Sequence, residues 1–213
     1  MDALLLPPRG ALPKTNDEDP VDYYYGVTAP LYRGRLAVAA RLLGRGYPSL
    51  LDVGYGSGIF FPELARRAER LVGVEVHGEE ARVGDALHGL GVDVDLRPGS
   101  ILELPAEDGE FDAVVCLNVL EHLRELGGAL SELRRVLTSG GMAVLGFPVR
   151  QPLTDAFFRL FGFDPRELHP SSHSDILRAA EQDEKFVVAR VAHFPRMLPL
   201  RLSGYAACRL RAV

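Results

Sequence analysis

Short apolar runs alternate with amphipathic segments along most of this chain, which is typical of strands alternating with helices. The apolar runs predict five short strands, at 49–53, 70–76, 92–97, 111–117 and 142–147. The segments between them predict helices, at 61–70, 79–90 and 126–137. We expect Gly140 and Gly141 to end the last of these helices. Strands joined by helices are connected by right-handed crossovers, so the pattern predicts a mostly parallel α/β sheet with helices on both faces.

Further segments extend this pattern toward both ends of the sequence. The additional helices and strands are predicted at 31–43, 174–181, 185–193 and 204–211. Residues 1–29 begin with an aperiodic stretch rich in proline and acidic residues, and we expect them to form a tail or cap. Residues 30–213 are predicted to form one domain, with an insert at about 149–173, where the alternation of strands and helices breaks.

Composition and charge narrow the class of protein. The formal net charge of −5 argues against a broad nucleic-acid-binding surface. No run of about 20 apolar residues occurs and the N-terminus lacks a basic leader, so we expect a cytoplasmic protein without a membrane span. Cys116 and Cys208 are too few for a disulfide framework, and we expect them in the core.

A glycine-rich loop with an acid on each side carries the strongest chemical signal. Gly54, Gly56 and Gly58 follow the first predicted strand, where glycines let a ligand approach bare backbone. Asp52 ends that strand, and Glu75 ends the next one, about 20 residues on, where a carboxylate accepts hydrogen bonds from a ribose. An acid at the loop entrance repels a pyrophosphate but suits an ammonium group. The loop therefore favours a ligand with a ribose and an ammonium over a dinucleotide.

At these residues the sequence resembles the class I S-adenosylmethionine-dependent methyltransferases, most closely the small-molecule, methyltransferase type 11-like branch. The matching segments are 51–58, Glu75, 98–105, 111–115, 120–123 and 137–141. The resemblance covers about residues 30–147 and implies a Rossmann-like sheet of seven mostly parallel strands with an antiparallel last strand. It also implies S-adenosyl-L-methionine as the cofactor.

The resemblance implies which residues bind this cofactor. Asp52 would lie near its ammonium, Glu75 would accept its ribose hydroxyls, and Val76 would pack on its adenine. The full predicted set is Asp52, Gly54, Tyr55, Gly56, Gly58, Glu75, Val76, Ser100, Ile101, Leu117 and Asn118.

Two members of this set depart from what many relatives carry. Tyr55 stands where Cys or Ala is common, and Ser100 stands where Asp is common. A serine hydroxyl accepts a hydrogen bond from the adenine amino group less strongly than a carboxylate does. Ser100 and Ile101 would frame the adenine edge, and Leu117 or Asn118 would close the sulfonium side.

Glu121 and His122 follow the fourth predicted strand, at the sheet edge where the methyl group should point. A hydroxyl acceptor must lose a proton, and histidine is suited to act as a base near neutral pH. We predict both as catalytic residues, with the alternative that they only begin or cap the next helix. Some relatives bind a divalent metal here through a Glu-x-x-Glu-His run. Because Asn118 stands at the first carboxylate position, we predict no metal site.

The predicted substrate-binding residues are Tyr25, Phe157, His169 and His173. Tyr25 would wall the cleft or belong to a surface linker. Phe157 belongs to an apolar stretch that is either a lid over a greasy substrate or a helix packed on the domain or on a partner subunit. The two histidines either point into the cleft or lie at an ordinary helix N-terminus.

The predicted function is S-adenosylmethionine-dependent methyl transfer to a small, hydrophobic molecule. A cofactor-binding subunit or sensor without catalysis is an alternative, motivated by Asn118 and Ser100. RNA or protein methylation is a further alternative, which the acidic balance disfavours. The expected partner is a small molecule rather than a nucleic acid, and a homodimer is left open.

Overall fold

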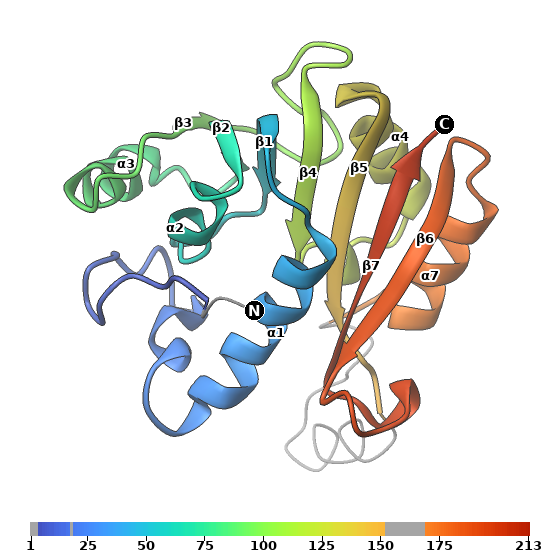
Figure 1. The fold of residues 1–213 in the computed structure, drawn as a ribbon, viewed down its shortest axis with the longest axis horizontal. Helices are drawn as coiled ribbons and strands as arrows, with labels where there is room; N and C mark the ends of the chain where they lie inside the picture. Colours follow the sequence, from blue (N-terminus) through green and yellow to red (C-terminus); the bar gives the residue numbers. More distant parts are fainter. Residues whose placement is uncertain (1–3, 18, 152–168) are drawn as a thin grey trace.

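A computed structural model describes residues 4–17, 19–151 and 169–213 and shows a sheet flanked by helices (Figure 1). In these residues the sheet has seven strands: β1 (Tyr47–Val53), β2 (Ala68–Glu75), β3 (Asp95–Pro98), β4 (Phe111–Leu117), β5 (Leu137–Pro148), β6 (Phe186–Phe194) and β7 (Tyr205–Ala212). The strand order is β3-β2-β1-β4-β5-β7-β6, and β7 is antiparallel to both of its neighbours. The predicted seven-stranded, mostly parallel sheet with an antiparallel last strand is confirmed.

Helices cover both faces of the sheet, as predicted. They are α1 (Ala29–Leu42), α2 (Phe61–Leu64), α3 (Glu80–Gly89), α4 (Leu126–Val136) and α7 (His173–Gln182), with short 3₁₀ helices η1 (Pro20–Tyr24), η2 (Gly26–Thr28), η3 (Leu120–His122) and η4 (Leu200–Leu202). Because successive side chains of a strand point to opposite faces, the buried residues form two cores. Leu51 and Val114 pack with α4 and α7, whereas Leu50 and Val115 pack with α1, α2 and α3. Both cysteines are buried, as expected.

None of the helices in the described ranges is long and apolar enough to cross a membrane.

The predicted helix at 61–70 is wrong beyond its first turn. Arg67 is buried and pairs with Glu63, and its carbonyl accepts a hydrogen bond from Tyr47 N at 2.9 Å. With these contacts the helix ends at Leu64, and β2 begins at Ala68. The polar Glu69, which fits a helix surface in the sequence pattern, lies instead on the exposed start of that strand.

Gly140 and Gly141 do not end a helix, which corrects the prediction for this segment. The strand β5 already begins at Leu137, the residue after α4, and Leu137 pairs with Phe111 on β4. Regular pairing resumes only at Met142, so the two glycines lie in an irregularity within β5. Gly140 has a φ of 75°, in the left-handed region that glycine tolerates. The two glycines therefore belong to the irregular part of β5 and do not end α4.

The predicted strand at 92–97 begins later, at Asp95. Val92 N donates to the Leu87 carbonyl at 3.0 Å, which continues the end of α3, so Val92 belongs to the turn before the strand. The predicted strand at 142–147 forms the later part of β5. The remaining predicted helices and strands begin and end within about two residues of their predicted bounds.

The N-terminal segment packs against the domain. Leu12, Val21 and Tyr24 are buried, and Leu5 N donates to the Glu63 carboxylate at 2.8 Å. These contacts order a stretch whose composition suggested a tail. The division of the chain at residues 29 and 30 stays a prediction, and most of the predicted insert lies outside the described residues.

Candidate active site

A cavity of about 490 Å³ opens at the carboxyl ends of β1, β2 and β4, beside the N-terminal segment. The predicted site residues that line it are Asp52, Gly54, Tyr55, Gly56, Glu75, Val76, Ser100, Ile101, Leu117, Asn118 and His122. These residues are distant in sequence but converge because the carboxyl ends of parallel strands meet at one edge of a sheet. Gly58, Glu121, Tyr25, His169 and His173 do not line the cavity.

Backbone hydrogen bonds shape the glycine loop. Gly54 N donates to the Val74 carbonyl and Gly58 N donates to the Tyr55 carbonyl, both at 2.9 Å. The φ angles of Gly54 and Gly58 are 77° and 80°, which side chains disfavour. A Cβ at Gly54 would also overlap the Val119 side chain. Glycine is therefore required where the loop leaves β1.

Glu75 connects the end of β2 to this loop. Its Oε2 accepts a hydrogen bond from Gly56 N at 3.0 Å, and its Oε1 accepts one from Val76 N at 2.8 Å. A carboxylate has about four acceptor sites, so acceptor capacity remains for a ligand. Val76, the next residue, has 73% of its surface exposed and offers an apolar face at the cavity.

Asp52 is a buried acid in the cavity wall. Only 4% of its surface is exposed. Burial, and after it the negative charge of Glu75, raise the pKa of Asp52 to about 8. Near neutral pH the carboxyl group therefore holds a proton, and a cation beside it would favour ionisation.

Asn118 combines backbone strain with an unpartnered polar atom. Its φ is 58°, in the left-handed region, and its N–H donates to the Gly146 carbonyl at 2.8 Å. Its Oδ1 is buried and has no hydrogen-bond partner among the residues that the structure describes. Strained residues cluster at ligand sites, and this oxygen is an acceptor that a ligand in the cavity can satisfy.

Glu121 and His122 lie on η3, directly after β4. The helix α4 begins only at Leu126, with Glu125 as its N-cap, so the alternative that they begin or cap the next helix is wrong. His122 lines the cavity. Glu121 is 2% exposed, and within the described ranges its buried Oε2 has no hydrogen-bond partner. Burial raises the pKa of Glu121 to about 7.

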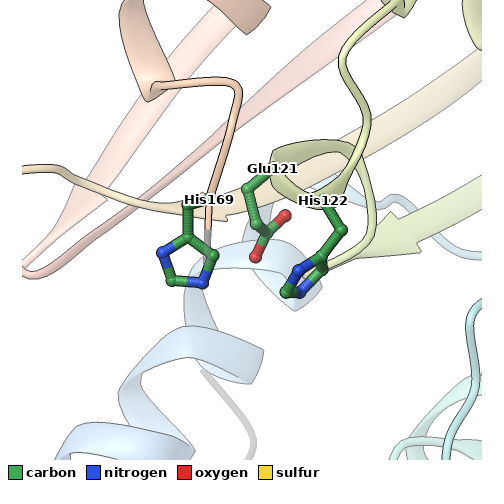
Figure 2. Close-up of side chains that lie close together, drawn as sticks. All are labelled: Glu121, His122 and His169. Atoms are coloured by element: carbon green, nitrogen blue, oxygen red, sulfur yellow. The ribbon is translucent and has the colours of Figure 1, made fainter. Parts of the chain in front are cut away.

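The two predicted histidines of the insert occupy different positions. The His169 ring lies 5.2 Å from the His122 ring between centroids, in an edge-on arrangement, and Figure 2 shows the Glu121 carboxylate between them. His173 instead begins α7, after the N-cap Ser172, and its Nδ1 accepts a hydrogen bond from Arg150 N at 3.2 Å. His173 thus lies at an ordinary helix N-terminus, which was the alternative interpretation of this residue. Burial lowers its pKa.

Tyr24, rather than Tyr25, contributes to the cavity. Tyr24 is 4% exposed and lines it, whereas the Tyr25 hydroxyl donates to the Pro7 carbonyl at 2.7 Å and points to the N-terminal segment. The structure thus places the predicted substrate residue Tyr25 away from the cavity. Phe157 and the apolar stretch around it lie outside the described residues.

The sequence pattern did not reveal that the N-terminal segment supplies a cavity wall through Thr15, Asn16 and Asp19. The Asp19 carboxylate accepts hydrogen bonds from the Thr15 hydroxyl at 2.7 Å and from Val21 N at 2.9 Å. Asp19 is therefore the N-cap of η1, with Pro20 next to it. An acid before a proline is typical of a helix start, so the Asp19-Pro20 pair could have predicted η1 from the sequence.

Comparison with known proteins adds a family to this geometry. A family model described as a methyltransferase domain matches residues 51–145. An enzyme of Hahella chejuensis named ubiquinone biosynthesis O-methyltransferase is 33% identical over 150 residues, covering 63% of this chain and 62% of that protein. The protein of the same name from Dechloromonas aromatica is 30% identical over 158 residues, covering 73% and 66%.

Solved structures share the fold. The N-methyltransferase NodS of Bradyrhizobium japonicum, in complex with S-adenosyl-L-homocysteine, superposes with a TM-score of 0.70 at 20% identity, covering 93% of this chain and 94% of that one. Geranyl diphosphate C-methyltransferase from Streptomyces coelicolor superposes with a TM-score of 0.69 at 18% identity, covering 95% and 90%. Among the curated relatives, the chain spans 62% of the Hahella protein and 44% of a Xanthomonas oryzae protein of the same name.

Proposed function

Because this chain belongs to the class I S-adenosylmethionine-dependent methyltransferases, we propose that it transfers the methyl group of S-adenosylmethionine to a small molecule. One observation carries the proposal: Asp52, the glycine loop and Glu75 line one cavity, and His122 lines the same cavity. The cavity thus combines groups suited to an ammonium and a ribose with a group suited to proton transfer.

Each of these groups has a proposed role toward the cofactor. Asp52 ionises beside the ammonium of the methionine part. Glu75 keeps its hydrogen bonds to Gly56 N and Val76 N and uses its remaining lone pairs for the ribose hydroxyls. The exposed face of Val76 packs on the adenine. Asn118 closes the cavity on the sulfonium side.

The chemistry needed from the chain is positioning and removal of one proton. When bound, S-adenosylmethionine would supply a methyl group whose carbon–sulfur bond breaks as the bond to the acceptor oxygen forms, which leaves a neutral thioether. We propose that the acceptor is a hydroxyl, as the relatives named O-methyltransferases suggest, and that His122 takes its proton. Apolar walls at Leu36, Ile59 and Phe60 favour a hydrophobic acceptor. The cytoplasmic location, the lack of nucleic-acid binding and the homodimer stay predictions.

We expect calorimetry to show binding of both S-adenosylmethionine and its demethylated product to the full chain. Transfer of a labelled methyl group to a panel of phenols and hydrophobic cell-extract metabolites should be observed. His122→Ala should lose turnover but keep cofactor binding, because His122 acts on the acceptor. Absence of cofactor binding would overturn the proposal, and binding with no transfer to any acceptor would favour a sensor.

We also expect cofactor binding to release a proton. Because the pKa of Asp52 is raised to about 8, the carboxyl is protonated below that pH, and a bound ammonium favours the carboxylate. Affinity should rise about tenfold per pH unit from pH 6 toward pH 8 and then level off. Calorimetry at pH 7 in two buffers of different ionisation enthalpy measures the released proton.

Asp52→Asn should abolish this proton release and flatten the pH dependence. The matched control is Asp85→Asn, on the exposed side of α3, which should behave as the wild type. A wild-type affinity that is constant from pH 6 to pH 8 would contradict the assigned role of Asp52.

A further inference from the structure

Three metal-ligating side chains meet at the carboxyl end of β4. One ligand atom from each of Glu121, His122 and His169 lies within 4.8 Å of the others. Figure 2 shows the two imidazole rings on either side of the carboxylate, on separate segments of the chain. A carboxylate and two imidazoles form a ligand set used for transition metals in proteins.

Hydrogen bonds from the segment after His169 hold this arrangement together. Ser171, which is buried, donates from its N–H to the Glu121 carbonyl at 3.2 Å and from its hydroxyl to the Leu123 carbonyl at 2.6 Å. These two bonds tie the segment to η3 on both sides of His122. The backbone that carries His169 is therefore held beside η3, which carries Glu121 and His122.

Glu121 supplies a second, independent indication of a ligand. It is 2% exposed, and its Oε2 is buried without a hydrogen-bond partner in the described residues. An unpartnered buried carboxylate oxygen costs free energy, which a cation bound to it would offset. The two imidazoles stand where such a cation would be held.

We propose that Glu121, His122 and His169 bind a divalent transition-metal cation of the zinc or cobalt type. Magnesium and calcium prefer all-oxygen ligand sets, whereas two imidazole nitrogens favour transition metals. Metal–ligand bonds of about 2.1 Å keep ligand atoms within about 4.2 Å of one another, so small side-chain rotations complete the site. Three protein ligands leave at least one coordination position open.

The proposed site differs from the Glu-x-x-Glu-His run through which some relatives bind a divalent metal. Asn118 replaces the first carboxylate of that run, and on that basis we predicted no metal site. The third ligand comes instead from His169, after β5. His122 also lines the cavity, so the ion would lie at its border. With the ion bound, His122 serves as a ligand, so its proposed role as proton acceptor belongs to the metal-free chain. The site forms without cofactor or acceptor and goes beyond the proposed function.

The test is a metal titration of the untagged, chelator-treated 213-residue chain without S-adenosylmethionine. We expect one Zn²⁺ or Co²⁺ per chain by calorimetry, and visible absorption bands of Co²⁺ that report nitrogen ligands. Glu121→Gln, His122→Ala and His169→Ala should each weaken binding by at least about tenfold. His88→Ala, which removes an exposed histidine of α3, is the matched control and should bind as the wild type does.

A second measurement separates loss of the site from loss of the fold. Zn²⁺ should raise the melting temperature of the wild type and of His88→Ala, but not of the three site variants. Absence of stoichiometric binding, equal binding by the site variants, or tighter binding of Mg²⁺ than of Zn²⁺ would overturn the proposal. Because no cofactor is present, a failure here leaves the proposed methyl transfer untouched, and the reverse also holds.

Discussion

Glu75→Ala is expected to weaken the binding of S-adenosylmethionine about 100-fold. The substitution removes the carboxylate that we propose accepts the two ribose hydroxyls, at about 1.5 kcal/mol for each charge-assisted hydrogen bond. It also removes the acceptor that holds Gly56 N at 3.0 Å, so the glycine loop loses its connection to β2. The loss should appear in the dissociation constant measured by calorimetry.

Two further variants sharpen this experiment. Glu69→Ala removes an exposed glutamate at the opposite end of the same strand and should leave cofactor affinity unchanged. Glu75→Gln keeps one acceptor oxygen and should lie between the wild type and the alanine variant. An affinity of Glu75→Ala within about threefold of the wild type would remove Glu75 from the proposed cofactor site.

Phe147→Ala is expected to lower the free energy of unfolding by about 3–5 kcal/mol. Phe147 lies on β5, is fully buried and belongs to the core that α4 and α7 cover. Removing the ring forfeits its burial and leaves a cavity that the sheet cannot readily close, because the pairing of Phe147 with Ala206 holds its backbone in the β5–β7 ladder. The melting temperature should fall by about 6–20 °C.

Urea unfolding followed by circular dichroism measures this loss. Val187→Ala, on β6, is the control, because the Val187 side chain is 45% exposed and its truncation should cost less than about 1 kcal/mol. Comparable losses for the two variants would contradict the assignment of Phe147 to a tightly packed core.

The order of strands and helices was readable from the sequence because it depends on local periodicity. The apolar runs that end at Val53 and Leu117 became β1 and β4 almost without change. The errors arose where a tertiary contact competes with local pattern. Arg67 ends α2 through its buried pairing with Glu63, and Gly140 lies in β5 because Leu137 already pairs with β4.

The candidate cofactor site was also largely readable, because its residues belong to short motifs at strand ends. Every predicted cofactor residue except Gly58 lines the cavity. The acceptor side was not readable in the same way. Tyr24 and Tyr25 are adjacent residues of the same type, so the sequence does not distinguish them. The 3₁₀ helix η1, which Asp19 caps, decides which of them reaches the cavity.

The sequence by itself determined the sheet, the glycine loop and the acids at the strand ends, since spacing along the chain is enough to specify them. Only the tertiary structure decided which distant groups meet. His169 and His173 are close neighbours in sequence, yet His169 lies beside His122 while His173 starts α7. Periodicity carries no information about such long-range pairs. Their proximity depends on hydrogen bonds such as those from Ser171 to η3 and the residue after it, which join segments far apart in the sequence.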